Sequence, residues 1–181
     1  MVDATASSES KDLTNYPDLS IGLHFELKEV KNVEAELNRQ LKKFTAIVGR
    51  MPDHIDTHKR HTTDDGIREV LEEVTKAHKI PVRNFHAKHV GSFGINSSDA
   101  SVEQLKKSID EATDKYNELM THCGYSDDYL REHSSYSDPR EQELKSICDP
   151  AIKQYLVEKG LVLCNWRQIN TTSQPQTPDI V

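Results

Sequence analysis

Residues 52–61 read Pro-Asp-His-Ile-Asp-Thr-His-Lys-Arg-His, and this stretch decides both the expected fold and the expected chemistry. Its central part, residues 54–58, has the form of a short buried strand that ends in histidine. Two other short apolar runs have the same form and end at His24 and His122. Three strands can therefore aim imidazoles at one point, which is how the site of a metal hydrolase is built.

Length and composition favour a single enzyme-sized domain. The chain has 181 residues, of which 35% are hydrophobic and 29% charged, enough for one α/β domain with a real core. The formal net charge of -7 argues against nucleic acid or an anionic membrane surface as the main partner, because both bind positive charge. We expect residues 1–169 to form that domain and residues 170–181, which lack a core-forming pattern, to be a disordered tail.

The three cysteines and the hydropathy pattern indicate a cytoplasmic protein. Cys123, Cys148 and Cys164 are too few for a disulfide framework and form no C-x-x-C metal pair. No apolar run approaches the roughly 20 residues that span a bilayer, and no signal-peptide pattern stands at the N-terminus.

Apolar runs alternate with amphipathic ones along the chain, which predicts parallel strands joined by helices. Apolar spacing of three and four predicts helices near residues 33–48, 65–74, 102–112 and 139–160, the last broken or kinked at Pro150 and ended by Gly160. Strands are expected at residues 20–27, 54–58, 81–85, 118–125 and 161–166.

The carboxyl ends of parallel strands share one rim, where functional residues gather. His24, His58 and His122 all fall near such ends, and neutral imidazole is a common ligand for a divalent metal that keeps open positions. Such a metal polarises a carbonyl and lowers the pKa of its bound water.

Asp56 alternates with His54 and His58 along its strand, so the three can share one face. We count Asp56 among the catalytic residues, as an acceptor that orients a ligating imidazole. Two alternatives stay open, a third metal ligand or a carboxylate paired with a nearby arginine. Arg60 and His61 follow the strand and are candidates for substrate contact, with a solvated loop as the equal alternative.

Four segments carry a family resemblance. They are Gly22-Leu23-His24, the run P-D-H-I-D-T-H at 52–58, the run E-L-M-T-H-C-G-Y-S-D at 118–127 and the run P-R-E-Q-E-L at 139–144. In order and interval they resemble successive signatures of the YdjC-like carbohydrate deacetylases, over most of the chain from Met1 to Arg167.

The resemblance implies a distorted (β/α) barrel and a hydrolase that removes acetyl groups from N-acetylated sugars such as chitooligosaccharides. It implies a divalent metal, magnesium first and zinc as the alternative, and a small carbohydrate as substrate. It places the metal ligands at His24 and His58 and the proton-transfer histidine at His122. Arg140 falls in a family motif, where substrate binding or carboxylate pairing is expected.

The chain departs from the family pattern in two places. Arg60 and Thr62 stand where the family commonly has further histidines. The A-D-D-F-G motif, whose aspartates supply a metal ligand and the general base, is absent, and Met1-Val2-Asp3 resembles the family's second strand.

The barrel is therefore expected to be incomplete at the N-terminus, with one strand edge exposed. Residues 4–15 can cover that edge, a homo-oligomer can pair it, or the gene product is longer, which we favour; Asp3 is a weaker candidate to replace the lost carboxylate. The alternative function is a catalytically inactive homologue that binds metal or carbohydrate, and the third is an interaction module.

Overall fold

Two short parallel strands organise the N-terminal part of the chain. The computed structural model describes residues 2–3, 12–13, 15–27, 32–57, 65–91, 93–95 and 98–169. Strand β1 (Leu23–Phe25) pairs in parallel with β2 (Ile55–Thr57), and His24 faces Asp56 in the register. On the other side of β2, a parallel bridge joins Ile55 to Val82. The prediction of an α/β fold with parallel strands is confirmed.

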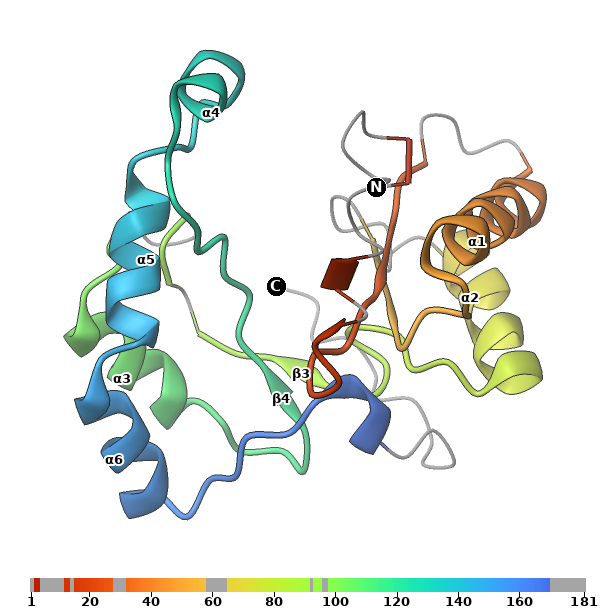
Figure 1. Ribbon diagram of the computed structural model, residues 1–181. Coiled ribbons are helices and arrows are strands. Elements are labelled where there is room, and N and C mark those ends of the chain that lie inside the picture. The colour runs from red at the N-terminus through yellow and green to blue at the C-terminus, as the bar shows by residue number, and fades with distance from the viewer. Residues whose placement is uncertain are drawn as a thin grey trace. The chain divides into compact units, whose positions relative to one another are not determined.

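Helix α1 (Val33–Val48) follows β1 and has the stripe of apolar residues that its sequence predicts. The stripe packs on β1 and on α2 (Asp65–His78), which lies beside α1 in Figure 1. Gly49 ends α1 in the left-handed region at φ 83°, where its N–H donates to the Thr45 carbonyl at 2.8 Å, as glycine commonly does after a helix.

The core of this part is made by the strands and both helices. Each fully buried leucine, isoleucine or phenylalanine contributes about 1.5–3 kcal/mol relative to leaving it exposed. The side chains that are almost completely buried include Leu23, Phe25, Leu37, Ile55, Ile67 and Leu71.

The contacts divide the chain into two units, Met1–Lys88 with Cys164–Val181, and His89–Leu163. In the second unit, α3 (Val102–Asp110) packs against α5 (Pro139–Ile147) and α6 (Pro150–Glu158), as Figure 1 shows. A smaller core joins them, formed by Phe93, Ala100, Leu105 and Ile152. The unit also holds α4 (Asp128–His133) and the strand pair of β3 (Lys88–His89), which begins at the unit boundary, with β4 (Asn117–Glu118).

Proline marks the start of both α5 and α6. Pro150 was expected to break or kink one helix, and it breaks it, because Pro150 begins α6. The missing N–H of proline costs nothing in a first turn. The side chain of Asp149 accepts from the Ala151 N–H at 2.8 Å and caps the new helix.

Two predicted strands are wrong. The strand expected at 118–125 stops at Glu118, and residues 119–127 have no regular secondary structure. The strand expected at 161–166 is irregular and ends in a 3₁₀ helix, Trp166–Gln168, with Val162 87% and Leu163 81% exposed. An apolar run makes a buried strand only where a neighbouring strand covers it, and this run has no strand partner among the described residues.

The expected strand at 81–85 is reduced to bridges at Val82 and Arg83, followed by a turn at 84–86. Among the described residues, the strands form two two-stranded sheets and no closed barrel. The tail from Asn170 lies outside the described residues.

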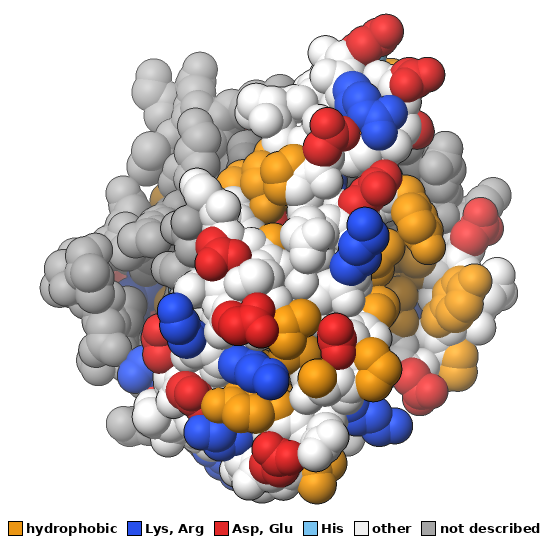
Figure 2. Space-filling view, turned by 90° about the vertical axis from the view of Figure 1, so that its left-hand side faces the viewer, with side chains coloured by type: hydrophobic (Ala, Val, Ile, Leu, Met, Phe, Trp, Pro, Cys, Tyr) orange, Lys and Arg blue, Asp and Glu red, His pale blue; other side chains and the backbone are white. Residues whose placement is uncertain are grey.

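One face of the molecule carries mixed charge. On the face shown in Figure 2, acidic, basic and hydrophobic side chains are interspersed, with no broad area of one sign. None of the helices in the described part of the chain combines the length and the hydropathy that a membrane span requires.

Candidate metal and proton-transfer site

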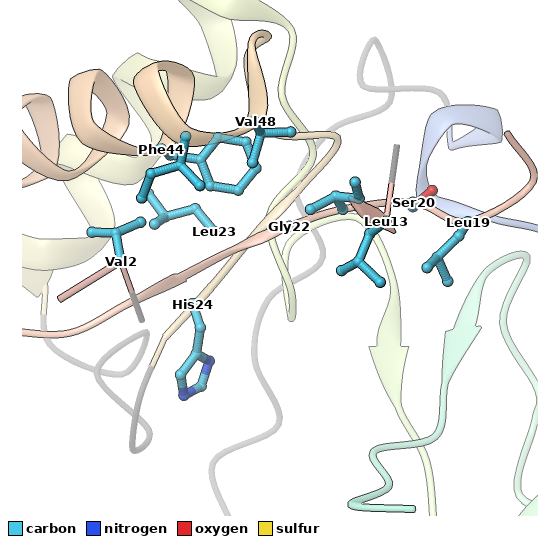
Figure 3. A pocket seen from close by; sticks show the side chains of 11 residues that line it. Val2, Leu13, Leu19, Ser20, Gly22, Leu23, His24, Phe44 and Val48 are labelled. Atoms are coloured by element: carbon cyan, nitrogen blue, oxygen red, sulfur yellow. The ribbon is translucent and has the colours of Figure 1, made fainter. Parts of the chain in front are cut away.

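The register of β1 and β2 brings His24 and Asp56 together. The Nδ1 atom of His24 lies 2.8 Å from Oδ2 of Asp56, and Asp56 is only 9% exposed. Figure 3 shows the His24 ring on the side of β1 opposite Leu23 and the Phe44 side chain of α1. Alternation along the strand thus turns Leu23 into the core and His24 away from it.

Arg83 also binds the Asp56 carboxylate. Its Nη1 lies 3.0 Å from the same Oδ2 atom, and Arg83 is placed there because its N–H donates to the Ile55 carbonyl at 3.0 Å. Burial raises the pKa of Asp56, but the hydrogen bond with His24 and the charges of Arg83, His24 and His54 outweigh it and leave the pKa below its usual value. The carboxylate is therefore ionised and can only accept.

An accepting carboxylate decides which nitrogen of His24 carries the proton. Nδ1 donates to Asp56, so the lone pair of the neutral ring is on Nε2. A carboxylate in this position is the usual partner of a metal-binding histidine, because it fixes the tautomer and the ring orientation. His24 and Asp56 therefore fit one imidazole ligand and its orienting acceptor.

Of the other predicted residues near this point, His58, Arg60 and His61 lie outside the described residues. The described strand ends at Thr57, directly before His58. Within the described ranges, no group of three His, Cys, Asp or Glu side chains could hold a metal ion. The metal role of His58 and the substrate roles of Arg60 and His61 stay predictions.

His54 directly precedes β2 and has a packing role in the structure. Its ring stacks on Trp166 with centroids 4.6 Å apart and planes 13° from parallel. It also lies over Gly22, where a Cβ atom would collide with the imidazole. The sequence signal for this contact was the glycine two residues before His24.

An ion pair just before β2 ties the two strands together. Arg50 donates to Asp53 at 2.6 and 2.9 Å, and the Ile21 N–H donates to the same carboxylate at 2.8 Å. Burial raises the pKa of Asp53, and the bonds from Arg50 and Ile21 outweigh it, so the pKa lies below its usual value. Sequence reasoning missed this pair, although the i, i+3 spacing could have indicated it.

Asp3 is also engaged in ion pairs. Lys43 and Arg39 of α1 donate to its two carboxylate oxygens, at 2.8 Å from Lys43 and 2.6 Å for the shorter bond from Arg39. These bonds hold the pKa of Asp3 well below its usual value. A carboxylate in this state is a weak base, which argues against Asp3 as a replacement for a missing catalytic aspartate.

A pocket of about 340 Å³ runs along β1, and His24 stands at its edge (Figure 3). Apart from His24, Ser20 and Gly22, the lining is aliphatic or aromatic. The residues are Val2, Leu13, Leu19, Ile21, Leu23, Phe44, Ile47 and Val48. Such a lining offers few donors or acceptors for the hydroxyl groups of a sugar.

His122, in the second unit, does not stand at the end of a strand as predicted. It lies in the irregular stretch 119–127, which is bound to α5 instead of to a neighbouring strand. The Glu143 carboxylate accepts the His122 N–H at 2.5 Å, and Arg140 donates from Nη1 to the His122 carbonyl at 3.2 Å. The His122 ring meets the ring of Tyr136 edge-on, with centroids 5.9 Å apart.

Glu143 and Tyr136 are the residues around His122 that sequence reasoning missed. Glu143 is fully buried, and Tyr136 donates its hydroxyl to the second carboxylate oxygen. The available signal was the spacing of Arg140 and Glu143, because residues three apart on a helix share a face. The structure thus brings His24 together with Asp56, and His122 together with Arg140, while the meeting of these two pairs stays a prediction.

Comparisons with known proteins agree with the resemblance. A family model described as YdjC-like protein matches residues 19–158. A carbohydrate deacetylase from Clostridium beijerinckii is 29% identical over 153 residues, which cover 77% of this chain and 62% of the relative. This chain therefore spans less than two thirds of that relative's length.

A crystal structure from Enterococcus faecalis has a similar fold. That protein is named for a proposed cellobiose-phosphate cleavage activity, and the superposition has a TM-score of 0.70 at 19% sequence identity. The match covers 88% of this chain and 81% of the other. At this level of identity, the likeness concerns the fold alone.

Proposed function

Because the chain belongs to the YdjC-like family, we propose that it is a carbohydrate deacetylase that removes acetyl groups from N-acetylated sugars with the help of a divalent metal. The observation that carries the proposal is the bond between Nδ1 of His24 and the buried, ionised Asp56. A histidine oriented in this way suits a metal site, and the name of the relative from Clostridium beijerinckii supports the choice of reaction.

Nε2 of His24 and the side chain of His58 are the proposed metal ligands. The metal, when bound, supplies an acidified water and polarises the amide carbonyl of the substrate. Magnesium follows from the family resemblance and zinc is the alternative, since imidazole nitrogen is the donor that zinc accepts more readily.

Asp56 is assigned to orientation and charge balance. Its carboxylate keeps the His24 proton on Nδ1, and Arg83 keeps the carboxylate ionised and fixed. This combines two of the roles considered for Asp56 from the sequence, the acceptor that orients an imidazole and the carboxylate paired with arginine.

His122 is the proposed proton-transfer residue. A histidine near the scissile amide can protonate the departing amine or stabilise the negative oxygen of the tetrahedral intermediate. Arg60 and His61 are the proposed contacts to the sugar. Arg140, for which the sequence led us to expect substrate binding or carboxylate pairing, binds two backbone carbonyls within its own unit.

The family premise also favours a distorted parallel barrel, with β1 and β2 as neighbouring strands, and a cytoplasmic location. Support for the fold comes from the parallel pairing of β1 with β2 and from the TM-score of 0.70. Tracing more strands around the same axis in an experimental structure would test it.

The test of the function is acetate release by the full chain. Purified protein is stripped with a chelator, reloaded with Mg²⁺ or Zn²⁺, and incubated with N,N′-diacetylchitobiose. We expect release that needs added metal and that is lost in His24→Ala, with His133→Ala as a control at an exposed histidine of α4. Metal binding by calorimetry without any acetate release would instead support the inactive homologue and overturn the proposal.

A further inference from the structure

One helix holds the backbone of His122 from both sides. Glu143 accepts the His122 N–H at 2.5 Å, and Arg140, one turn earlier on α5, donates to the His122 carbonyl at 3.2 Å. The two groups belong to the peptides on either side of the His122 Cα atom. Fixing both peptides fixes φ and ψ of His122 and with them the direction of its Cα–Cβ bond.

Glu143 has an environment that packing alone does not explain. Its side chain is fully buried, and a Cβ atom at Gly94 would collide with its carboxylate. Burying a carboxylate costs free energy, and an apolar residue of similar volume is often at least as stable. The charge-assisted bonds from His122 and Tyr136 offset this cost, and through them the buried carboxylate orients both groups.

Tyr136 joins the same arrangement from the other side. Its carbonyl accepts from Nε of Arg140 at 2.7 Å, and the Arg140 guanidinium lies 5.8 Å from the centre of its ring. Burial and the bond to Glu143 raise the pKa of Tyr136 to about 12, so the hydroxyl remains a donor near neutral pH. This fixed ring meets the His122 imidazole in a T-shaped contact, with the two planes at 71°.

We propose that Arg140 and Glu143 are positioning residues that hold His122 in the orientation needed for proton transfer. This inference rests on the proposed role of His122 in deacetylation. It changes the role expected of Arg140 from the sequence, because Nε and Nη1 of its guanidinium are used on the carbonyls of Tyr136 and His122.

Positioning and substrate binding have different kinetic signatures. Loss of a substrate contact made equally in the ground and transition states raises KM and leaves kcat unchanged, whereas a misplaced proton-transfer group lowers kcat. The kcat and KM values of Arg140→Lys therefore separate the two roles, since lysine keeps the charge but cannot reproduce the planar fork of arginine.

The second readout needs no turnover. Amide hydrogen exchange at His122, followed by NMR on the full chain, reports how firmly its N–H is held. Glu143→Gln keeps the shape of the side chain but removes its charge. The matched control is Glu141→Gln, on the same helix, whose carboxylate accepts the Ser126 N–H at 3.0 Å and does not contact His122.

For Glu143→Gln we expect exchange at the His122 amide to become about tenfold faster, as for a charge-assisted hydrogen bond replaced by a neutral one. We expect kcat to fall about tenfold or more with KM nearly unchanged, because orientation contributes to the transition state. Glu141→Gln should change neither quantity, and Arg140→Lys should follow Glu143→Gln in kcat.

Three results would overturn the inference. The first is an exchange rate at the His122 amide of Glu143→Gln that equals the wild-type rate. The second is a change in exchange rate and kcat in Glu141→Gln as large as that in Glu143→Gln. The third is a raised KM with unchanged kcat in Arg140→Lys. If Glu143→Gln fails to fold, Arg140→Lys decides alone. Wild-type protein that releases no acetate would overturn the proposed function, and the exchange measurement would still test the bonds to His122.

Discussion

The Nδ1 atom of His24 lies 2.8 Å from Oδ2 of Asp56, across a parallel strand pair and a sequence separation of 32 residues. The strand register alone accounts for this meeting, because the two residues face each other in β1 and β2. Arg83 completes the arrangement, directly after the residue that bridges to β2 at Ile55.

Asp56→Asn is expected to weaken metal binding about 10- to 100-fold, the usual effect of losing a carboxylate that orients a ligating histidine. Calorimetric titration of the folded variant with Zn²⁺ and Mg²⁺ measures it. Asp53→Asn is the matched control, since Asp53 is also paired with an arginine but does not contact His24. Equal metal affinity in Asp56→Asn and the wild type would contradict the orienting role.

The same carboxylate should make stability depend on pH. The folded-state pKa of Asp56 is lowered, so its contribution is fully present above the unfolded value of about 3.9 and is lost as pH falls through the folded value. Urea unfolding of the wild type and Asp56→Asn should differ by about 2 kcal/mol near neutral pH, as for a hydrogen bond to a charged group. This difference in the free energy of unfolding should shrink as the pH falls. A difference that grows in acid would mean that the pKa of Asp56 is raised in the folded state.

His24→Ala and His58→Ala are each expected to abolish metal binding. A metal site needs three or more ligands, and each substitution removes one of the two proposed imidazole ligands. Calorimetry and metal content after dialysis provide the measurement. His133→Ala, at an exposed histidine, should bind as the wild type does. Unchanged affinity in both of the first two variants would rule out the assignment.

His122→Ala is expected to lower turnover by about 100- to 10,000-fold, the range for loss of a general acid or base, while metal content stays intact. Acetate release and elemental analysis of the same preparation test both halves. Loss of metal in this variant would make His122 a metal ligand.

Gly94→Ala should destabilise the second unit by more than the cost of placing alanine in a left-handed backbone conformation. Gly94 and Gly49 both have positive φ, at 58° and 83°, but only at Gly94 would a Cβ atom collide with Glu143. We expect Gly49→Ala to cost about 1 kcal/mol and Gly94→Ala clearly more, since strain of the backbone costs about 1–3 kcal/mol before any clash. Gly124→Ala, which has neither feature, is the control. Equal losses of thermal stability in Gly94→Ala and Gly124→Ala would contradict this account.

Local sequence was sufficient for the described α-helices other than α4, which the apolar spacing did not predict. The apolar stripe of α1 and the glycine after it predicted the helix and its end, and Pro150 predicted the break between α5 and α6. These features depend on residues within a few positions of one another, so the sequence contains their physical cause.

The sequence was not sufficient where hydrogen-bonding partners come from distant segments. Residues 118–125 look like a strand, but beyond Glu118 the backbone groups of this stretch bond to Arg140, Glu141 and Glu143 on α5. Val162 and Leu163 look like a buried strand and are exposed. Both predictions failed because a strand needs a partner, which local pattern does not supply.

The sequence by itself thus determined the helices other than α4, the parallel α/β class, the family and the histidines to consider. Only the tertiary structure decided that Arg83 holds Asp56, that Asp56 sets the proton on His24, and that Arg140 and Glu143 hold His122. The physical reason is the sequence separation of the interacting residues. The periodicity of apolar residues indicates which side of a helix or strand is buried. The partner of a buried charged group lies on a distant segment, which comes close only when the chain has folded.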